Sequence, residues 1–134
     1  MTRRSALLHT TALLALAAPG LLSGCQSDVA YSQSALNSLQ TREFNFTIDK
    51  TFDACVGSLF DLGYTIRSSD KRGGFVSAVN QGSILQIKLD QLGPTNTAVR
   101  VSTSEGGQTR VDKPLIDAFF NTLERRLLTA ERGT

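Results

Sequence analysis

Three turn signals divide the chain between Tyr64 and Glu105 into four strand-length pieces, and this pattern constrains the fold more than any other feature. The turns are predicted at residues 70–74, 81–82 and 93–96, which are rich in Gly, Asp, Asn and Pro. The pieces between them cover residues 64–69, 75–80, 83–91 and 97–105. Because such short loops join strands that run in opposite directions, we expect four consecutive antiparallel strands.

Alternation of apolar and polar residues supports these strands and adds one before them. In the third piece, residues 83–91, the alternation is clear, with Leu85, Ile87 and Leu89 between Gln86, Lys88 and Asp90. The same period starts after Glu43, with Phe44, Phe46 and Ile48 between Asn45, Thr47 and Asp49. A period of two is typical of a strand with one buried face. The segment from Glu43 is therefore predicted to be the first strand.

Two other segments have the three- and four-residue spacing of amphipathic helices. The first is expected to begin at a cap formed by Asp49 or Thr51 and to end at a left-handed Gly63; its apolar residues are Phe52, Cys55, Val56, Leu59 and Phe60. The second is expected to begin at Asp112 or Lys113, with Pro114 in its first turn, and to end near Ala130; its apolar residues are Ile116, Phe119, Phe120, Leu123 and Leu127.

The element order strand, helix, four strands, helix predicts an α+β fold for residues 42–134. A domain this small needs both helices to bury their apolar sides against the same sheet. We expect a two-layer sandwich in which a five-stranded antiparallel sheet carries two helices on one face. The other face is then open to solvent or to a partner, and is expected to present Asn45, Thr47, Arg67, Lys88 and Arg100.

Residues 1–24 have the layout of an export signal. Arg3 and Arg4 precede an interrupted apolar run that falls short of the ~20 apolar residues of a membrane span. The run ends in Leu22-Ser23-Gly24-Cys25, which resembles the lipobox of bacterial lipoproteins. The resemblance implies cleavage between Gly24 and Cys25 and attachment of lipid to Cys25. Palmitate is one of the expected acyl groups.

The lipobox resemblance also implies an address. Two or three acyl chains form a stable membrane anchor, and Gln26 after the cysteine favours the outer membrane, with the protein facing the periplasm. Residues 25–41 are then expected to be a tether, the alternative for part of it being a short helix over residues 34–40. Other readings are retention in the inner membrane, cleavage after Ala17 to give a soluble periplasmic protein, and export through a twin-arginine signal.

Composition excludes several classes of function for the chain after cleavage. Without Arg3 and Arg4, twelve of the fourteen Lys and Arg remain, equal to the twelve Asp and Glu, so no excess positive charge favours nucleic acid. The only histidine, His9, lies in the signal, which excludes His-based catalysis and His-containing metal sites. Lipid on Cys25 leaves Cys55 without a disulfide partner, and we expect it to be a small buried hydrophobe. No cofactor is predicted.

A segment of about forty residues resembles a pattern found in small Gram-negative lipoproteins. It has a Thr-Arg-x-Phe strand entry, a helix that ends in Asp-Leu-Gly-Tyr, and then Asp and Gly before a strand. In this chain those residues are Thr41, Arg42, Phe44, Asp61, Leu62, Gly63, Tyr64, Asp70 and Gly74. Similar domains occur in the BamC lipoprotein, an accessory part of the machinery that inserts outer-membrane barrels. The resemblance implies a strand-helix-four-strand-helix domain and, more distantly, a role in envelope assembly.

Three functions are compatible with these features. The first is a non-enzymatic module that presents its open sheet face or an edge strand to an envelope protein, and this is the function we expect. The alternative is a carrier or sensor of a small apolar ligand. The third is an enzyme whose only candidate groups are Asp49, Asp53, Asp61, Asp70 and Asp90; we expect no enzymatic activity.

Arg125 and Arg126 lie near the end of the second predicted helix. Positive charge there complements the helix dipole, so we expect a solvated pair. The alternative is a patch that binds a partner.

Overall fold

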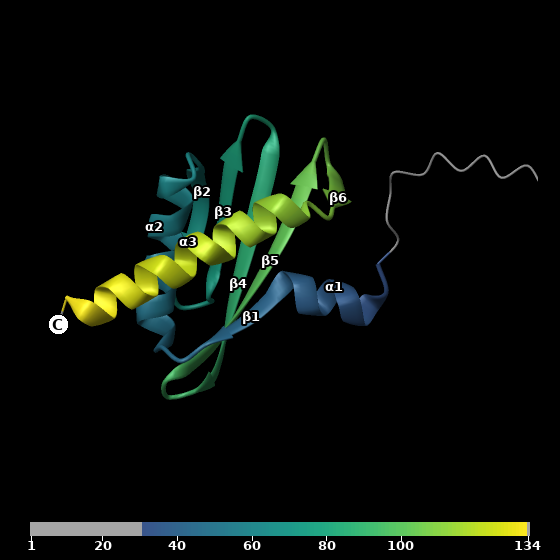
Figure 1. The fold of residues 1–134 in the computed structure, drawn as a ribbon. Helices are drawn as coiled ribbons and strands as arrows, with labels where there is room; N and C mark the ends of the chain where they lie inside the picture. The colour runs from purple at the N-terminus through teal and green to yellow at the C-terminus, as the bar shows by residue number, and fades with distance from the viewer. Residues whose placement is uncertain (1–30, 134) are drawn as a thin grey trace, which may run out of the picture. The chain divides into compact units, whose positions relative to one another are not determined.

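The computed structural model describes residues 31–133, which belong to one compact unit that begins at Tyr31 (Figure 1). Its elements follow the predicted α+β order, with two additions. They are α1 (Gln33–Gln40), β1 (Thr41–Phe44), α2 (Ile48–Asp61), β2 (Thr65–Asp70), β3 (Phe75–Asn80), β4 (Ser83–Gly93), β5 (Asn96–Glu105), β6 (Gln108–Arg110) and α3 (Lys113–Arg132).

The strands form one antiparallel sheet of six strands in the order β1-β5-β4-β3-β2, with β6 also paired to β5. The predicted run of antiparallel neighbours from β2 to β5 is confirmed. The sixth strand corrects the prediction of five. Gly106 and Gly107, at φ 60° and 79°, form a two-residue turn of the hairpin type, so the chain folds back and β6 pairs with the end of β5.

The two predicted helices cover one face of the sheet, and α3 crosses β3, β4 and β5 (Figure 1). Their apolar residues enter one core with alternate residues of the strands, as the two-layer prediction requires. Side chains that are fully buried include Leu59 of α2, Leu85 and Ile87 of β4, Val99 and Val101 of β5, and Phe119 and Phe120 of α3. The space between helices and sheet is therefore filled by packed side chains.

Helix α2 begins earlier than predicted. Its cap is Thr47, whose hydroxyl accepts a hydrogen bond from the Lys50 N–H at 3.3 Å, and the first strand ends at Phe44. The prediction of a strand through Ile48 and of a cap at Asp49 or Thr51 was wrong because the apolar residues of this connection pack against the core in a non-strand backbone. The predicted end is confirmed, with Gly63 at φ 81° after the helix.

Helix α1 confirms the alternative prediction of a short helix over residues 34–40 within the tether. Ser32 caps this helix, Leu39 packs against the core and Gln40 is buried. The helix contacts β1, β5 and α3. The folded part thus includes residues that were predicted to belong to the tether of residues 25–41. The prediction missed them because their sparse apolar positions show no clear period.

The Thr-Arg-x-Phe residues couple β1 to α3. The Arg42 guanidinium lies 4.7 Å from the centre of the Phe120 ring and pairs with Asp117 at 3.6 Å. The ring of Phe44 stacks on Phe120 with 6.3 Å between centroids. Helix α3 itself begins at the predicted cap, since the Asp112 carboxylate accepts from the Leu115 N–H at 3.1 Å, and it ends two residues beyond Ala130.

Candidate functional site

The sheet face opposite the helices presents the residues that alternate with the core. On the two long central strands these are Ile84, Gln86, Lys88 and Asp90 of β4 and Ala98, Arg100, Ser102 and Ser104 of β5. We call this surface the open face. The predicted positions of Lys88 and Arg100 are confirmed. Asn45 and Thr47 were wrongly placed on this face, because they follow the end of β1.

Charges on the open face lie in two neighbouring rows across the strands. Lys88 and Arg100 are direct cross-strand partners, and we call them the cation row. One step along the strands, Ala98 lies between Asp90 on β4 and Glu43 on β1; we call Asp90 and Glu43 the acid row. The like charges of the cation row are thus direct neighbours, an arrangement that destabilises a sheet, whereas Ala98 separates the two acids.

Few contacts within the chain neutralise these rows. Lys88 Nζ lies 3.9 Å from Asp90 Oδ1, and both side chains are more than half exposed. Among residues 31–133, neither Arg100 nor Glu43 has an ion-pair partner. Beside the cation row the surface is hollowed by about 310 Å³, and the hollow is lined by Phe75, Gln86, Ile87, Lys88, Arg100 and Ser102. The open face therefore has both a surface hollow and unneutralised charge.

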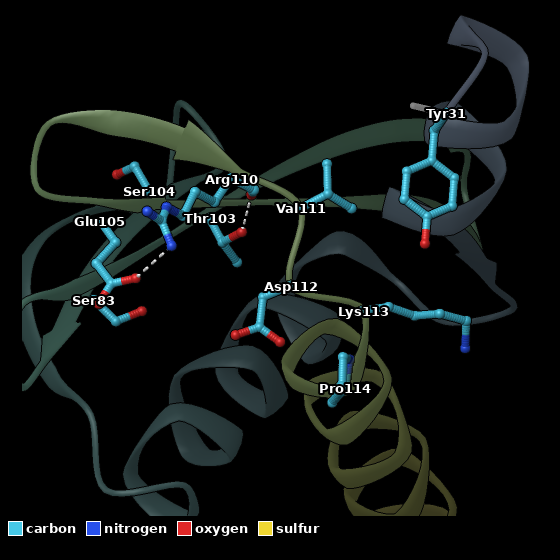
Figure 2. A pocket seen from close by; sticks show the side chains of 10 residues that line it. All are labelled: Tyr31, Ser83, Thr103, Ser104, Glu105, Arg110, Val111, Asp112, Lys113 and Pro114. Atoms are coloured by element: carbon cyan, nitrogen blue, oxygen red, sulfur yellow. Dashed lines mark hydrogen bonds and ion pairs between the residues drawn. The ribbon is translucent and has the colours of Figure 1, made fainter. Parts of the chain in front are cut away.

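A second hollow, of about 320 Å³, lies where α3 begins beside β5 and β6 (Figure 2). Its charged groups already have structural partners. Arg110 Nη1 lies 3.6 Å from Glu105 Oε2, the Thr103 hydroxyl donates to the Arg110 carbonyl, and Asp112 caps α3. These contacts hold the β5-β6 hairpin and the helix start in place, so this hollow offers fewer free groups than the open face.

Comparison with known proteins does not assign the chain. No protein-family model matches it, and no curated protein matches it in sequence.

The residues of the predicted lipid site, Gly24 and Cys25, lie outside the described residues, so cleavage and lipidation stay predictions. Within residues 31–133 no helix is long and apolar enough to cross a bilayer.

The five candidate carboxylates are spread over the molecule. Asp49 is in the first turn of α2, Asp53 pairs with Lys71 at 3.0 Å, and Asp70 accepts from the Gly73 N–H in the β2-β3 turn. Asp61 pairs with Arg126, and Asp90 lies near Lys88. In the described part of the chain, no three His, Cys, Asp or Glu side chains come together as a group that could hold a metal ion.

Asp61 and Arg126 join α2 to α3. Two hydrogen bonds link them, Nε to Oδ2 at 2.6 Å and Nη2 to Oδ1 at 2.9 Å. The hydrogen bond from Arg126 holds the pKa of Asp61 below its usual value, and the same bond raises the pKa of Arg126. A Cβ on Gly57 would lie 2.6 Å from the guanidinium carbon, so the bare backbone of α2 leaves room for the pair.

This pair modifies the prediction for the two arginines. Arg126 is bound to Asp61 across the helix interface instead of being solvated alone. Arg125 Nη2 donates to Thr122 Oγ1 at 3.4 Å on its own helix. Only Arg126 is thus held in an ion pair, and the location of both side chains near the end of α3 agrees with the dipole argument.

Cys55 is completely buried in the core, as predicted. Burial raises the pKa of its thiol because the apolar surroundings disfavour the thiolate.

Sequence reasoning missed the acid row. Asp90 was considered as a polar strand residue and a candidate catalytic group, and Glu43 as a strand start. Their proximity depends on the pairing of β1 with β5, which are far apart in the chain, and alternation within one strand carries no information on that pairing.

Proposed function

We propose that this chain is a lipid-anchored, non-enzymatic module of the bacterial cell envelope that uses its open face to dock a protein partner in the periplasm. The observation that carries the proposal is the open face itself, since α1, α2 and α3 bury the other side of the sheet or its edge. The open face spans five strands and is left to solvent.

The chemistry of the open face supports docking. Its centre combines exposed Lys88 and Arg100 with half-buried Phe75 and Ile84. Protein interfaces are of this mixed kind, with apolar and aromatic area among polar groups that fix orientation. The incompletely neutralised charges add selectivity, because a partner of complementary potential gains most from binding.

An edge strand is the less favoured docking surface. The sheet has β2 at one edge and β1 with β6 at the other. The pairing of β2 with β3 shifts between Ile66 and Ser68, and the exposed Arg67 lies at that shift. Irregularities and charges of this kind protect an edge from pairing with another strand.

Packing favours a docking module over the alternative of an apolar-ligand carrier. Leu59, Leu85 and Phe119 occupy the space between helices and sheet and are 0% exposed. A ligand of useful size would have to displace such side chains, which is costly in a close-packed core. The non-enzymatic part of the proposal is supported by the separate locations and structural partners of the carboxylates.

The membrane part of the proposal is supported by sequence alone. The lipobox resemblance at Gly24 and Cys25 implies the anchor, and Gln26 favours the outer membrane. Confinement to a membrane surface raises the effective concentration of a module toward partners on the same surface, which suits weak docking through an exposed face.

Photo-crosslinking in cells tests the docking face. A benzoylphenylalanine residue at Gln86, in the middle of the open face, is expected to give a specific crosslinked protein band. The same residue at Asn121, exposed on α3, is the matched control and is expected to give none. Equal crosslinking at the two positions, or none at Gln86, would contradict the proposed docking face.

A further inference from the structure

We propose that the open face docks a second copy of this chain, so that two sheets pack face to face about a two-fold axis. This inference rests on the proposed function and specifies its partner. It comes from the order of charges on the face, because the cation row and the acid row are neighbours on a single surface.

Two-fold symmetry brings unlike rows together. A symmetric interface uses the same patch on both copies, so a contact between two different residues is repeated with the copies exchanged. When the axis lies in the interface and runs between the two rows, the cation row of one copy faces the acid row of the other. Lys88 then faces Asp90 of the second copy, and Arg100 lies diagonally across from Glu43. Each contact occurs twice.

The arrangement relieves the like-charge neighbours that the isolated sheet carries. Lys88 beside Arg100 is unfavourable within one copy, whereas an acid row placed above both cations neutralises them. The contact given up is small: Lys88 and Asp90 are 3.9 Å apart and more than half exposed, and exposed pairs of this kind contribute little to stability.

The centre of the open face is long enough for such a contact. Strand β4 has 11 residues and β5 has 10, which at about 3.3 Å per residue makes the centre of the face about 35 Å long, while the four to six residues of β1, β2 and β3 narrow it toward its sides. A standard protein interface needs about 800 Å² from each partner. Face-to-face packing of two twisted sheets is also a common arrangement, with strands about 30° apart.

Charge reversal with tagged full-length copies in the same cells tests the inference. The acidic variant is Lys88→Glu with Arg100→Glu, and the basic variant is Glu43→Lys with Asp90→Lys. Two wild-type copies with different tags are expected to copurify after mild solubilisation. Each variant is expected to copurify with itself at least about tenfold less, because like charges then face each other. The acidic and basic variants together are expected to copurify as well as wild type.

The rescue by the opposite variant separates loss of docking from loss of folding. The control is Lys50→Glu with Arg72→Glu, which changes the net charge equally at exposed positions away from the open face and is expected to leave copurification unchanged. The inference is wrong if wild-type copies do not copurify, or if each variant still copurifies with itself. If that happens while Gln86 crosslinks to a different protein, the docking function stands and only the second copy is excluded as partner.

Discussion

At the scale of single residues, Gly74 lies where the β2-β3 turn meets β4. Its φ is 66°, and a Cβ there would lie 2.5 Å from the Leu89 carbonyl oxygen. The Leu89 N–H donates to the Gly74 carbonyl at 2.7 Å, which holds the two backbones together. The absence of a side chain is therefore needed twice, for the left-handed backbone and for the close approach.

We predict that Gly74→Ala lowers the free energy of unfolding by about 3 kcal/mol, the cost of a left-handed alanine plus a backbone collision. Gly82→Ala is the control, since Gly82 has φ 86° but open space around it, and it should cost only about 1 kcal/mol. Urea unfolding measures both. Equal losses would mean that the contact with Leu89 contributes nothing.

The Asp61–Arg126 pair predicts a pH dependence of stability. Because Arg126 lowers the folded-state pKa of Asp61, the pair stabilises the fold above the unfolded-state pKa of about 3.9, and this contribution is lost as the pH falls through the lower folded-state pKa. Arg126→Gln should raise the pKa of Asp61 toward its usual value. Arg125→Gln should raise it less, since Arg125 acts on Asp61 only through space. NMR titration of the Asp61 carboxyl carbon distinguishes the two.

At the scale of elements, local capping residues predict the start of one helix and fail for the other, whose start depends on contacts with the sheet. Helix α3 begins where Asp112 and Pro114 indicated, whereas α2 begins at Thr47 because the chain leaves the sheet after Phe44. The carbonyl of Phe46 accepts from the Thr97 hydroxyl at 2.9 Å. That contact with β5 fixes the path of the chain between β1 and α2.

We predict that Thr47→Ala costs about 1 kcal/mol in the free energy of unfolding, because the Lys50 N–H loses its acceptor. Thr47→Ser should restore most of the stability. Asp49→Ala should cost at most about 0.5 kcal/mol, the contribution of an exposed acidic residue near a helix start. Thermal and urea unfolding provide the values. A larger loss at Asp49 than at Thr47 would identify Asp49 as the cap.

At the scale of the whole molecule, the helices on one face leave the sheet's other face for interaction, while the predicted anchor lies before the compact unit. The proposed roles of the two parts are separable. In the proposal, the anchor sets the location and the open face sets what the module binds.

We predict that Cys25→Ser releases the protein from the membrane or leaves it uncleaved, without unfolding the compact unit that begins at Tyr31. Cys55→Ala is the control, because that thiol is buried in the core and should not affect attachment. Membrane fractionation and the mass of the mature chain test both. Unchanged processing and attachment of Cys25→Ser would contradict the lipid anchor.

By itself the sequence determined the antiparallel run from β2 to β5, the apolar sides of α2 and α3, and the burial of Cys55. These features follow from spacing and turn residues that lie close together in the chain, so local physics is sufficient for them. The sequence also carries the whole case for Cys25, which no described residue can test.

Only the tertiary structure decided which residues share the open face. The pairing of β1 with β5 places Glu43 in line with Asp90, and the end of β1 at Phe44 removes Asn45 and Thr47 from the face. Packing of Leu39 against the core likewise joined residues 33–40 to the folded part. The physical reason is the same in these cases: pairing and burial join residues distant in the chain, and a local pattern of hydrophobicity does not specify the partner.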